Sequence, residues 1–262
     1  MQKRFHTRMR RYGAWLCAAL LAGCGAEAQN GSSGETGRLS AVDGWLTLEM
    51  TDETSLAVRP AGLLIPVGDE ALADAAADAL AQIADGRTAS LSYPGETRDR
   101  YERAIAIVTL DDGTTLQDAM VAAGWARVYS WPGETAGIAE LLALEAEARG
   151  AGRGLWADPA YRVRTPDPNL LALDLDSVQI VEGRIISTAE VDGRTYLNFG
   201  FDYRSDFTVS VEARDRSAFE AAGIELLALE GAEVRVRGWV HAMNGPAITI
   251  DHPERLEILS PP

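Results

Sequence analysis

The stretch that constrains this sequence most runs from Arg98 to Trp156, where an apolar run, two helical patterns and a glycine-rich ending follow one another. Residues 104–110 are apolar almost throughout, which is typical of a buried strand. After a turn, Thr114 or Thr115 can cap a first helix, and apolar residues recur at helical spacing over 138–148 in a second. This order predicts the closing part of a small β-barrel followed by two helices.

The residues before this stretch supply the remaining strands of such a barrel. Short apolar runs bounded by Asp, Gly and Pro predict strands, and an alanine-rich segment with leucines on one face predicts a helix. Three strands, a helix and two strands is the order of a five-stranded OB barrel. The predicted strands are 38–42, 45–50, 55–64, 87–93 and 104–110, and the predicted helix is 69–84.

The features of this region resemble the thermonuclease (staphylococcal-nuclease-like) family over residues 38–161. The resemblance rests on the entry Asp99, Tyr101 and Arg103, on the Asp112-Gly113 turn, and on the closing run Gly152-Arg153-Gly154-Leu155-Trp156. It implies an OB barrel with two extra helices at its C-terminal end. In active members, Ca²⁺ held by carboxylates, a Glu that activates water and two arginines together cleave a phosphodiester.

The active-site residues that the resemblance implies are only partly present. Arg59 and Arg103 match the two arginines, and Tyr101 matches the tyrosine beside them, so these three are the expected phosphate-binding residues. The positions of two metal-binding acids hold Trp45 and Leu64. Hydrocarbon side chains supply no oxygen for Ca²⁺, so we expect no metal site, no cofactor and no confident catalytic residue.

Two alternatives stay open at this point. The position of the catalytic Glu holds Val67, but nearby acids could be recruited in place of the missing ones, in which case Ca²⁺ would be the cofactor. Arg59 and Arg103 could instead be structural arginines that pair with the many carboxylates of the chain. The nearby acids are Asp52, Glu53, Asp69 and Glu70.

The N-terminal residues 1–23 have the pattern of a bacterial lipoprotein signal peptide. Basic residues precede a short apolar run, 15–22, which is too short to cross a bilayer as a permanent helix. The run Leu21-Ala22-Gly23-Cys24 resembles a lipobox, in which the thiol of Cys24 is lipidated. Residues 24–37 then form a flexible tether. With Gly25 after the cysteine, we expect an anchor in the bacterial cell envelope, in the outer membrane facing the periplasm or the cell surface.

The charge of the chain limits its partners. The formal net charge is −15, and cleavage would remove basic residues with the signal peptide. Non-specific binding to nucleic acid needs a basic face and counterion release, which this charge opposes. A concave site with two arginines can still hold one phosphate. The expected partners are a membrane through Cys24, a phosphate or nucleic-acid ligand, and a protein partner of unknown kind.

A second domain follows a proline-containing linker, 162–176. From residue 177 to residue 262 the pattern alternates, and it again gives the OB order of three strands, a helix and two strands. OB folds often bind oligonucleotides on the face of the second and third strands, where aromatic rings stack on bases. The alternative is that these aromatics are core. The candidate binding residues are Tyr196, Phe199, Arg204 and Phe207.

Taken together, the sequence predicts a mainly β protein with helices (α+β), built from two tandem OB-fold-like five-stranded barrels. The leading functional hypothesis is a lipid-anchored envelope protein whose thermonuclease-like domain has lost catalysis and acts as a phosphate- or nucleic-acid-binding or assembly module. One alternative is an active Ca²⁺-dependent phosphodiesterase on DNA or RNA. The other is a purely structural interaction protein.

Overall fold

The computed structural model describes residues 33–262, and these residues belong to one compact unit. The predicted signal peptide, the predicted lipidation site Cys24 and most of the predicted tether lie outside the described residues. In the described part of the chain, no helix is both long and apolar enough to cross a membrane. The first strand already begins at Ser33, so it includes residues 33–37, which the sequence analysis assigned to the tether.

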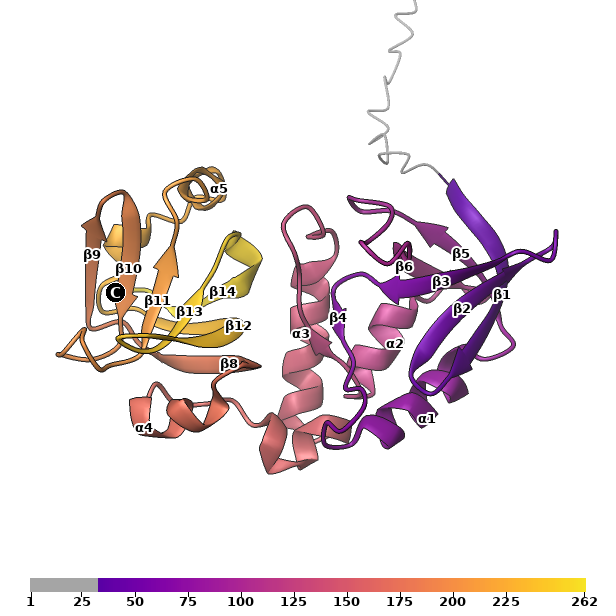
Figure 1. The fold of residues 1–262 in the computed structure, drawn as a ribbon, viewed down its shortest axis with the longest axis horizontal. Helices are drawn as coiled ribbons and strands as arrows, with labels where there is room; N and C mark the ends of the chain where they lie inside the picture. The colour runs from indigo at the N-terminus through magenta and orange to yellow at the C-terminus, as the bar shows by residue number, and fades with distance from the viewer. Residues whose placement is uncertain (1–32) are drawn as a thin grey trace, which may run out of the picture. The chain divides into compact units, whose positions relative to one another are not determined.

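Five strands of the first half close into a barrel (Figure 1). Around the ring the order is β1, β2, β3, β6 and β5, and neighbours run antiparallel except β3 and β6, which run parallel. This is the strand order of an OB fold, as predicted. The strands are β1 (Ser33–Val42), β2 (Trp45–Met50), β3 (Ser55–Pro60), β5 (Thr88–Ser92) and β6 (Ala104–Leu110).

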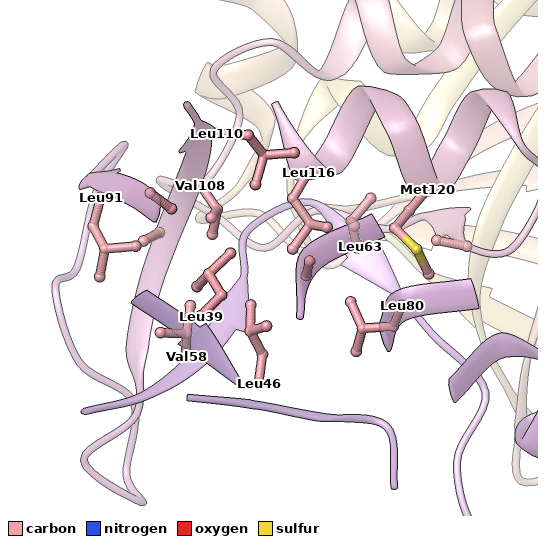
Figure 2. Close-up of a cluster of buried hydrophobic side chains, with 14 of the residues drawn as sticks. Leu39, Leu46, Val58, Leu63, Leu80, Leu91, Val108, Leu110, Leu116 and Met120 are labelled. Atoms are coloured by element: carbon pink, nitrogen blue, oxygen red, sulfur yellow. The ribbon is translucent and has the colours of Figure 1, made fainter. Parts of the chain in front are cut away.

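The core of this barrel is filled by apolar side chains from every barrel strand, from two helices, and from Ile138 and Leu141 at the start of a third. Figure 2 shows these side chains converging on one another between the strands and the helices. Their removal from water is the main favourable contribution to folding. The first two helices are α1 (Ala73–Ala84) and α2 (Leu116–Ala122). The labelled core residues are Leu39, Leu46, Val58, Leu63, Leu80, Leu91, Val108, Leu110, Leu116 and Met120.

The end of α2 packs against the glycine-rich segment that follows the next helix. Thr115 caps α2, because its hydroxyl accepts a hydrogen bond from the backbone N–H of Asp118 at 3.0 Å. The N–H of Leu155 donates to the carbonyl of Gly124 at 2.9 Å. A Cβ on Gly124 would lie 2.3 Å from the carbonyl oxygen of Arg153, so this contact requires glycine. The elements here are α3 (Ile138–Gly150), η1 (Gly154–Ala157) and η2 (Pro159–Tyr161).

Besides the early start of β1, two predicted boundaries in the first barrel are wrong. The strand predicted over 55–64 ends at Pro60, and after a turn at Gly62, with φ of 75°, the chain forms the short strand β4 (Leu63–Leu64). β4 pairs with β7 (Arg127–Val128), outside the barrel. The helix predicted from Asp69 begins at Ala73, because Leu72 has a φ of 60°, which no right-handed helix accommodates.

The second half repeats the OB order when β8 and β9 are taken as two halves of one bent strand. β8 pairs with β12 and β9 pairs with β10, while β11 and β13 run parallel, so the strands follow one another in the OB order. β14 adds a further strand beside β12. The strands are β8 (Ser177–Arg184), β9 (Ser187–Val191), β10 (Arg194–Asn198), β11 (Thr208–Val211), β12 (Glu233–Met243), β13 (Gly245–Thr249) and β14 (Leu256–Ser260).

Short helices occupy the connections of this half. The segment predicted as a linker contains two of them, and Arg164 pairs there with Asp174 at 2.8 Å. Two more lie between β11 and β12, in the place of the predicted helix, and a last one precedes β14. They are α4 (Pro168–Leu171), η3 (Ala172–Asp174), α5 (Arg216–Ala221), η4 (Leu226–Leu229) and η5 (Pro253–Arg255).

Buried ion pairs connect the two barrels. The side chain of Arg237 on β12 is 1% exposed, and its Nη2 lies 3.0 Å from Glu145 Oε2 on α3 and 2.7 Å from Glu257 Oε1. Its Nη1 donates to the carbonyl of Val128 at 2.8 Å. Burial alone would lower the pKa of Arg237, but the ion pairs with Glu145 and Glu257 outweigh it and raise the pKa. The two barrels therefore share one buried polar interface.

Candidate functional site

Two parallel strands bring the predicted arginines together. Arg59 lies on β3 directly opposite Ile105 of β6, and Arg103 precedes β6 by one residue. Both guanidinium groups face the carboxylate of Asp99. The Oδ2 atom of Asp99 is 2.7 Å from Arg103 Nη2 and 3.9 Å from Arg59 Nε. The structure therefore places Arg59 and Arg103 side by side, against the same carboxylate.

A second carboxylate at this site, that of Glu134, was not predicted from the sequence. Glu134 is buried and lies 75 residues from Arg59 along the chain, and its Oε1 is 2.6 Å from Arg59 Nη2. A turn aims the side chain back at the barrel, because the N–H of Glu134 donates to the carbonyl of Trp131 at 2.9 Å. The ring of Trp131 covers the guanidinium at 4.6 Å. Nothing in the spacing of the sequence indicated this contact.

The positive charges of the two arginines at this site are matched by the negative charges of two carboxylates. Burial alone would raise the pKa of Asp99, but hydrogen bonds from the Arg103 side chain and from the N–H groups of Tyr101 and Arg103 outweigh it and lower the pKa. Asp99 is therefore ionised at neutral pH. Two guanidinium groups face two carboxylates, so the arginines already have counter-ions. Arg59 Nη1 and Glu134 Oε2 are both buried and have no hydrogen-bond partner among the described residues.

An exposed stack of rings and cations extends from Arg103. The guanidinium of Arg103 lies 5.7 Å from the ring centre of Trp45 and 5.4 Å from that of Tyr101. Arg100 covers Tyr101 at 4.7 Å and donates to its hydroxyl at 2.7 Å. Trp45 and Tyr101 are 57% and 63% exposed. The structure thus places all three predicted phosphate-binding residues, Arg59, Arg103 and Tyr101, around one surface.

The residues at this site do not suit a Ca²⁺ ion. Trp45 and Val67 are exposed and Leu64 is half-buried, and none of them carries an oxygen ligand. Among residues 33–262, no group of three or more Asp, Glu, His or Cys side chains is placed to hold a metal. The ion-pair partners of Arg59 and Arg103 in this part of the chain are Asp99 and Glu134, rather than the nearby acids that the sequence analysis considered.

On the second barrel, two of the four predicted binding residues are in the core. Phe207 is fully buried and Phe199 is 8% exposed, and their ring centres lie 5.0 Å apart. This corrects the expectation that they stack on a ligand, because their faces pack inside the barrel. Tyr196 lines a cavity on the outer surface, and Arg204 is exposed and lies 5.2 Å from the ring of Tyr203.

A serine, a histidine and an aspartate form a further constellation between the barrels. Ser130 Oγ is 2.7 Å from His252 Nε2, and His252 Nδ1 is 2.6 Å from Asp251 Oδ1. These contacts have the connectivity of a hydrolytic triad. Ser130 is completely buried, however, and its carbonyl accepts a hydrogen bond from Arg255 at 2.9 Å. A substrate cannot reach this hydroxyl, so we assign the three residues to the packing of the interface.

The comparison with protein families agrees with this geometry. Residues 59–158 match the family model described as "Staphylococcal nuclease homologue". The match begins at Arg59 and includes Asp99, Arg103 and Glu134. The chain therefore contains a staphylococcal-nuclease-like domain, as the resemblance predicted, and this class indicates a nuclease-like or nucleic-acid-binding function. A comparison with curated proteins found no match.

Proposed function

We propose that this protein is a lipid-anchored protein of the bacterial cell envelope whose nuclease-like barrel has lost catalysis. In this proposal the barrel acts as a phosphate- or nucleic-acid-binding or assembly module. The observation that carries the proposal is the composition of the first-barrel site. Its two arginines are neutralised by Asp99 and Glu134, and hydrocarbon side chains stand where the resemblance places metal ligands and the general base.

Loss of hydrolysis follows from what the reaction requires. Cleavage of a phosphodiester at neutral pH needs a nucleophile and stabilisation of the charge that develops on phosphorus. Arg59 and Arg103 can stabilise such charge, but Trp45, Leu64 and Val67 can neither ligate a metal nor accept a proton from water. We therefore expect hydrolysis as slow as in a site that lacks both the metal ion and the general base.

Binding of a phosphate at this site has a competitor inside the protein. Glu134 occupies one side of the Arg59 guanidinium and is itself buried, so a phosphate must displace it or bind at Arg103 beside Tyr101. We therefore expect weak phosphate binding that depends strongly on salt. An exposed surface of Trp45, Tyr101 and Arg103 is also suited to contact with a protein, since aromatic and arginine residues are enriched at interfaces.

The location rests on the N-terminal sequence. Lipidation at Cys24 would tether the described domains to a membrane, and Gly25 after the cysteine favours the outer membrane. A diacylated cysteine with a further acyl chain holds a protein at a bilayer stably, whereas a single chain does not.

A nuclease assay tests the proposal. Purified mature protein is incubated with single-stranded DNA or RNA and Ca²⁺, and the incubation is repeated with EDTA. We expect no metal-dependent cleavage, because no group at the site activates water.

Cleavage that EDTA abolishes and that disappears in Arg103→Ala would instead establish an active phosphodiesterase and end the proposal. Titration of the same protein with an oligonucleotide at low salt distinguishes a binding module from a purely structural protein. A salt-sensitive complex supports the binding module, and its absence supports a purely structural protein.

A further inference from the structure

A cavity of about 590 Å³ opens on the outer surface of the second barrel. Its floor is the outward face of β9, β10 and β11, and one end is closed by the turn between β12 and β13. We call this cavity the aromatic groove. Its principal lining residues are Tyr196, Asn198, Phe201, Tyr203, Met243 and Asn244.

Two rings in the wall of the aromatic groove are held out into solvent. Phe201 is 96% exposed and Tyr203 is 59% exposed. Their loop is ordered by local hydrogen bonds, since the carboxylate of Asp206 accepts from the N–H of Asp202 at 2.6 Å. A Cβ on Gly200 would lie 1.9 Å from that carboxylate, so a larger residue here would have to displace the Asp206 side chain. A firmly built loop that exposes a whole phenylalanine ring indicates a ligand that covers it.

Part of the floor of the aromatic groove, where β9, β10 and β11 meet, carries uncharged polar side chains. Thr208 donates to the side-chain oxygen of Asn198 at 3.3 Å, and Asn198 donates to the hydroxyl of Ser187 at 3.3 Å. These long bonds cross three strands and leave hydrogen-bonding capacity on each group. The floor can therefore exchange hydrogen bonds with neutral hydroxyl or amide groups of a ligand.

The charges around the aromatic groove oppose a polyanion. Arg194 is the one charged residue among those that line it, and it is ion-paired with Glu212. The hydrogen bonds from Arg194 to Glu212 and then Tyr196 raise the pKa of Arg194. The loop that carries Phe201 adds Asp202 and Asp206 against Arg204. A nucleic-acid backbone would thus meet no free excess of positive charge.

A peptide in an extended conformation is also a poor ligand for the aromatic groove. An extended peptide binds a barrel by pairing with an open strand edge, and β9 is the end strand on this side. The aromatic groove, however, is lined by side chains on one face of β9 and β10 and not by the free backbone edge of β9. Recognition in the aromatic groove must therefore depend on side chains rather than on added β-pairing.

We propose that the aromatic groove binds an uncharged oligosaccharide. Sugar rings present apolar C–H faces, which pack on aromatic rings, and neutral hydroxyl groups, which suit the amides and hydroxyls of the floor. OB barrels bind oligosaccharides as well as oligonucleotides on this face. The volume lies within the range of pockets that enclose small ligands. The proposal concerns the second barrel alone and does not depend on the function proposed for the first.

Calorimetric titration of the purified mature protein with chitohexaose and with cellohexaose tests this proposal. We expect saturable binding of at least one of the two sugars. The double variant Phe201→Ala/Tyr203→Ala should weaken the affinity about tenfold or more, because two ring faces are lost. The matched control is Trp239→Ala on β12, which removes a 48% exposed aromatic ring away from the groove and should leave the affinity unchanged.

Thermal unfolding of both variants confirms that they are folded, which the exposure of Phe201 leads us to expect. The proposal is overturned if neither sugar binds saturably, or if binding persists in the double variant. It is equally overturned if a thymidine oligonucleotide or an uncharged peptide binds more tightly than the sugars and loses that affinity in the double variant.

Discussion

At the scale of single residues, the first-barrel site is decided by Glu134. The predicted arginines could be found from the sequence, because Arg59 and Arg103 stand in local motifs that resemble those of thermonucleases. Glu134 could not be found, because its contact with Arg59 depends on the turn at Trp131 and on the closure of the barrel. This residue changes the expected chemistry, since it turns a cationic pocket into a neutral one.

The substitution Glu134→Gln should free the Arg59 guanidinium to bind an anionic ligand. Removing one negative charge at a partly buried site changes the binding free energy by about 1 kcal/mol, which is about fivefold in affinity. Fluorescence anisotropy with a labelled single-stranded oligonucleotide at low salt measures the change. Glu140→Gln, an exposed acid in the first turn of α3, is the matched control and should show a much smaller effect. Equal affinity in the two variants would argue against Glu134 as an internal counter-ion.

At the scale of elements, strands and helices followed from local pattern, and the errors lie where the backbone takes special conformations. The run of apolar residues predicted β6 with its observed bounds, 104–110. The same reasoning extended β3 to Leu64, because residue type alone did not show that the chain turns at Gly62. Phe199 and Phe207 were wrongly predicted to bind a ligand. The alternation of apolar and polar residues along a strand does not show which face of that strand packs in the core.

The close contact between α2 and the closing glycine-rich segment can be tested at Gly124. Gly124→Ala should lower the free energy of unfolding by about 3 kcal/mol or more, because it combines a left-handed backbone, with φ of 79°, and a backbone clash. Gly113→Ala is the control, since it has φ of 84° with no atom within 4 Å and should cost about 1 kcal/mol. Urea unfolding of both variants measures the difference. Similar costs would show that the contact with Arg153 does not matter.

At the scale of the whole molecule, the two barrels are bound together by side chains that are far apart in the sequence. Arg237 and Glu145 are separated by 92 residues, and both are buried. Each barrel could be predicted separately from the sequence, because the order of its strands follows from the residue pattern within its own half of the chain. The sequence did not predict their shared interface, because an Arg and a Glu in two distant patterns resemble any other surface charges until the chain is folded.

Loss of Arg237 should destabilise the whole described unit. Arg237→Met removes the nearest cation from the buried Glu145, which keeps Arg149 at 3.7 Å, while Glu257 keeps Arg235 at 3.1 Å. Breaking a buried ion pair typically costs about 3–5 kcal/mol in the free energy of unfolding, and the remaining arginines place the expected loss at about 3 kcal/mol. Adding Glu145→Leu to this variant should recover part of the loss, since fewer buried charges then remain unpaired. Thermal and urea unfolding measure both effects, and we expect one cooperative transition. Two separate transitions in the unaltered protein would mean that the barrels fold independently of this interface.

The central claim is that the first barrel has kept its arginines and lost its metal site. Calorimetric titration of the purified mature protein with Ca²⁺ tests it most directly. We expect no saturable one-to-one binding at millimolar Ca²⁺, because the ligand positions hold Trp45 and Leu64, whose side chains carry no oxygen. One-to-one binding that disappears in Asp69→Asn or Glu70→Gln, but persists in the control Glu140→Gln on α3, would show that recruited acids form a metal site and would contradict this proposal.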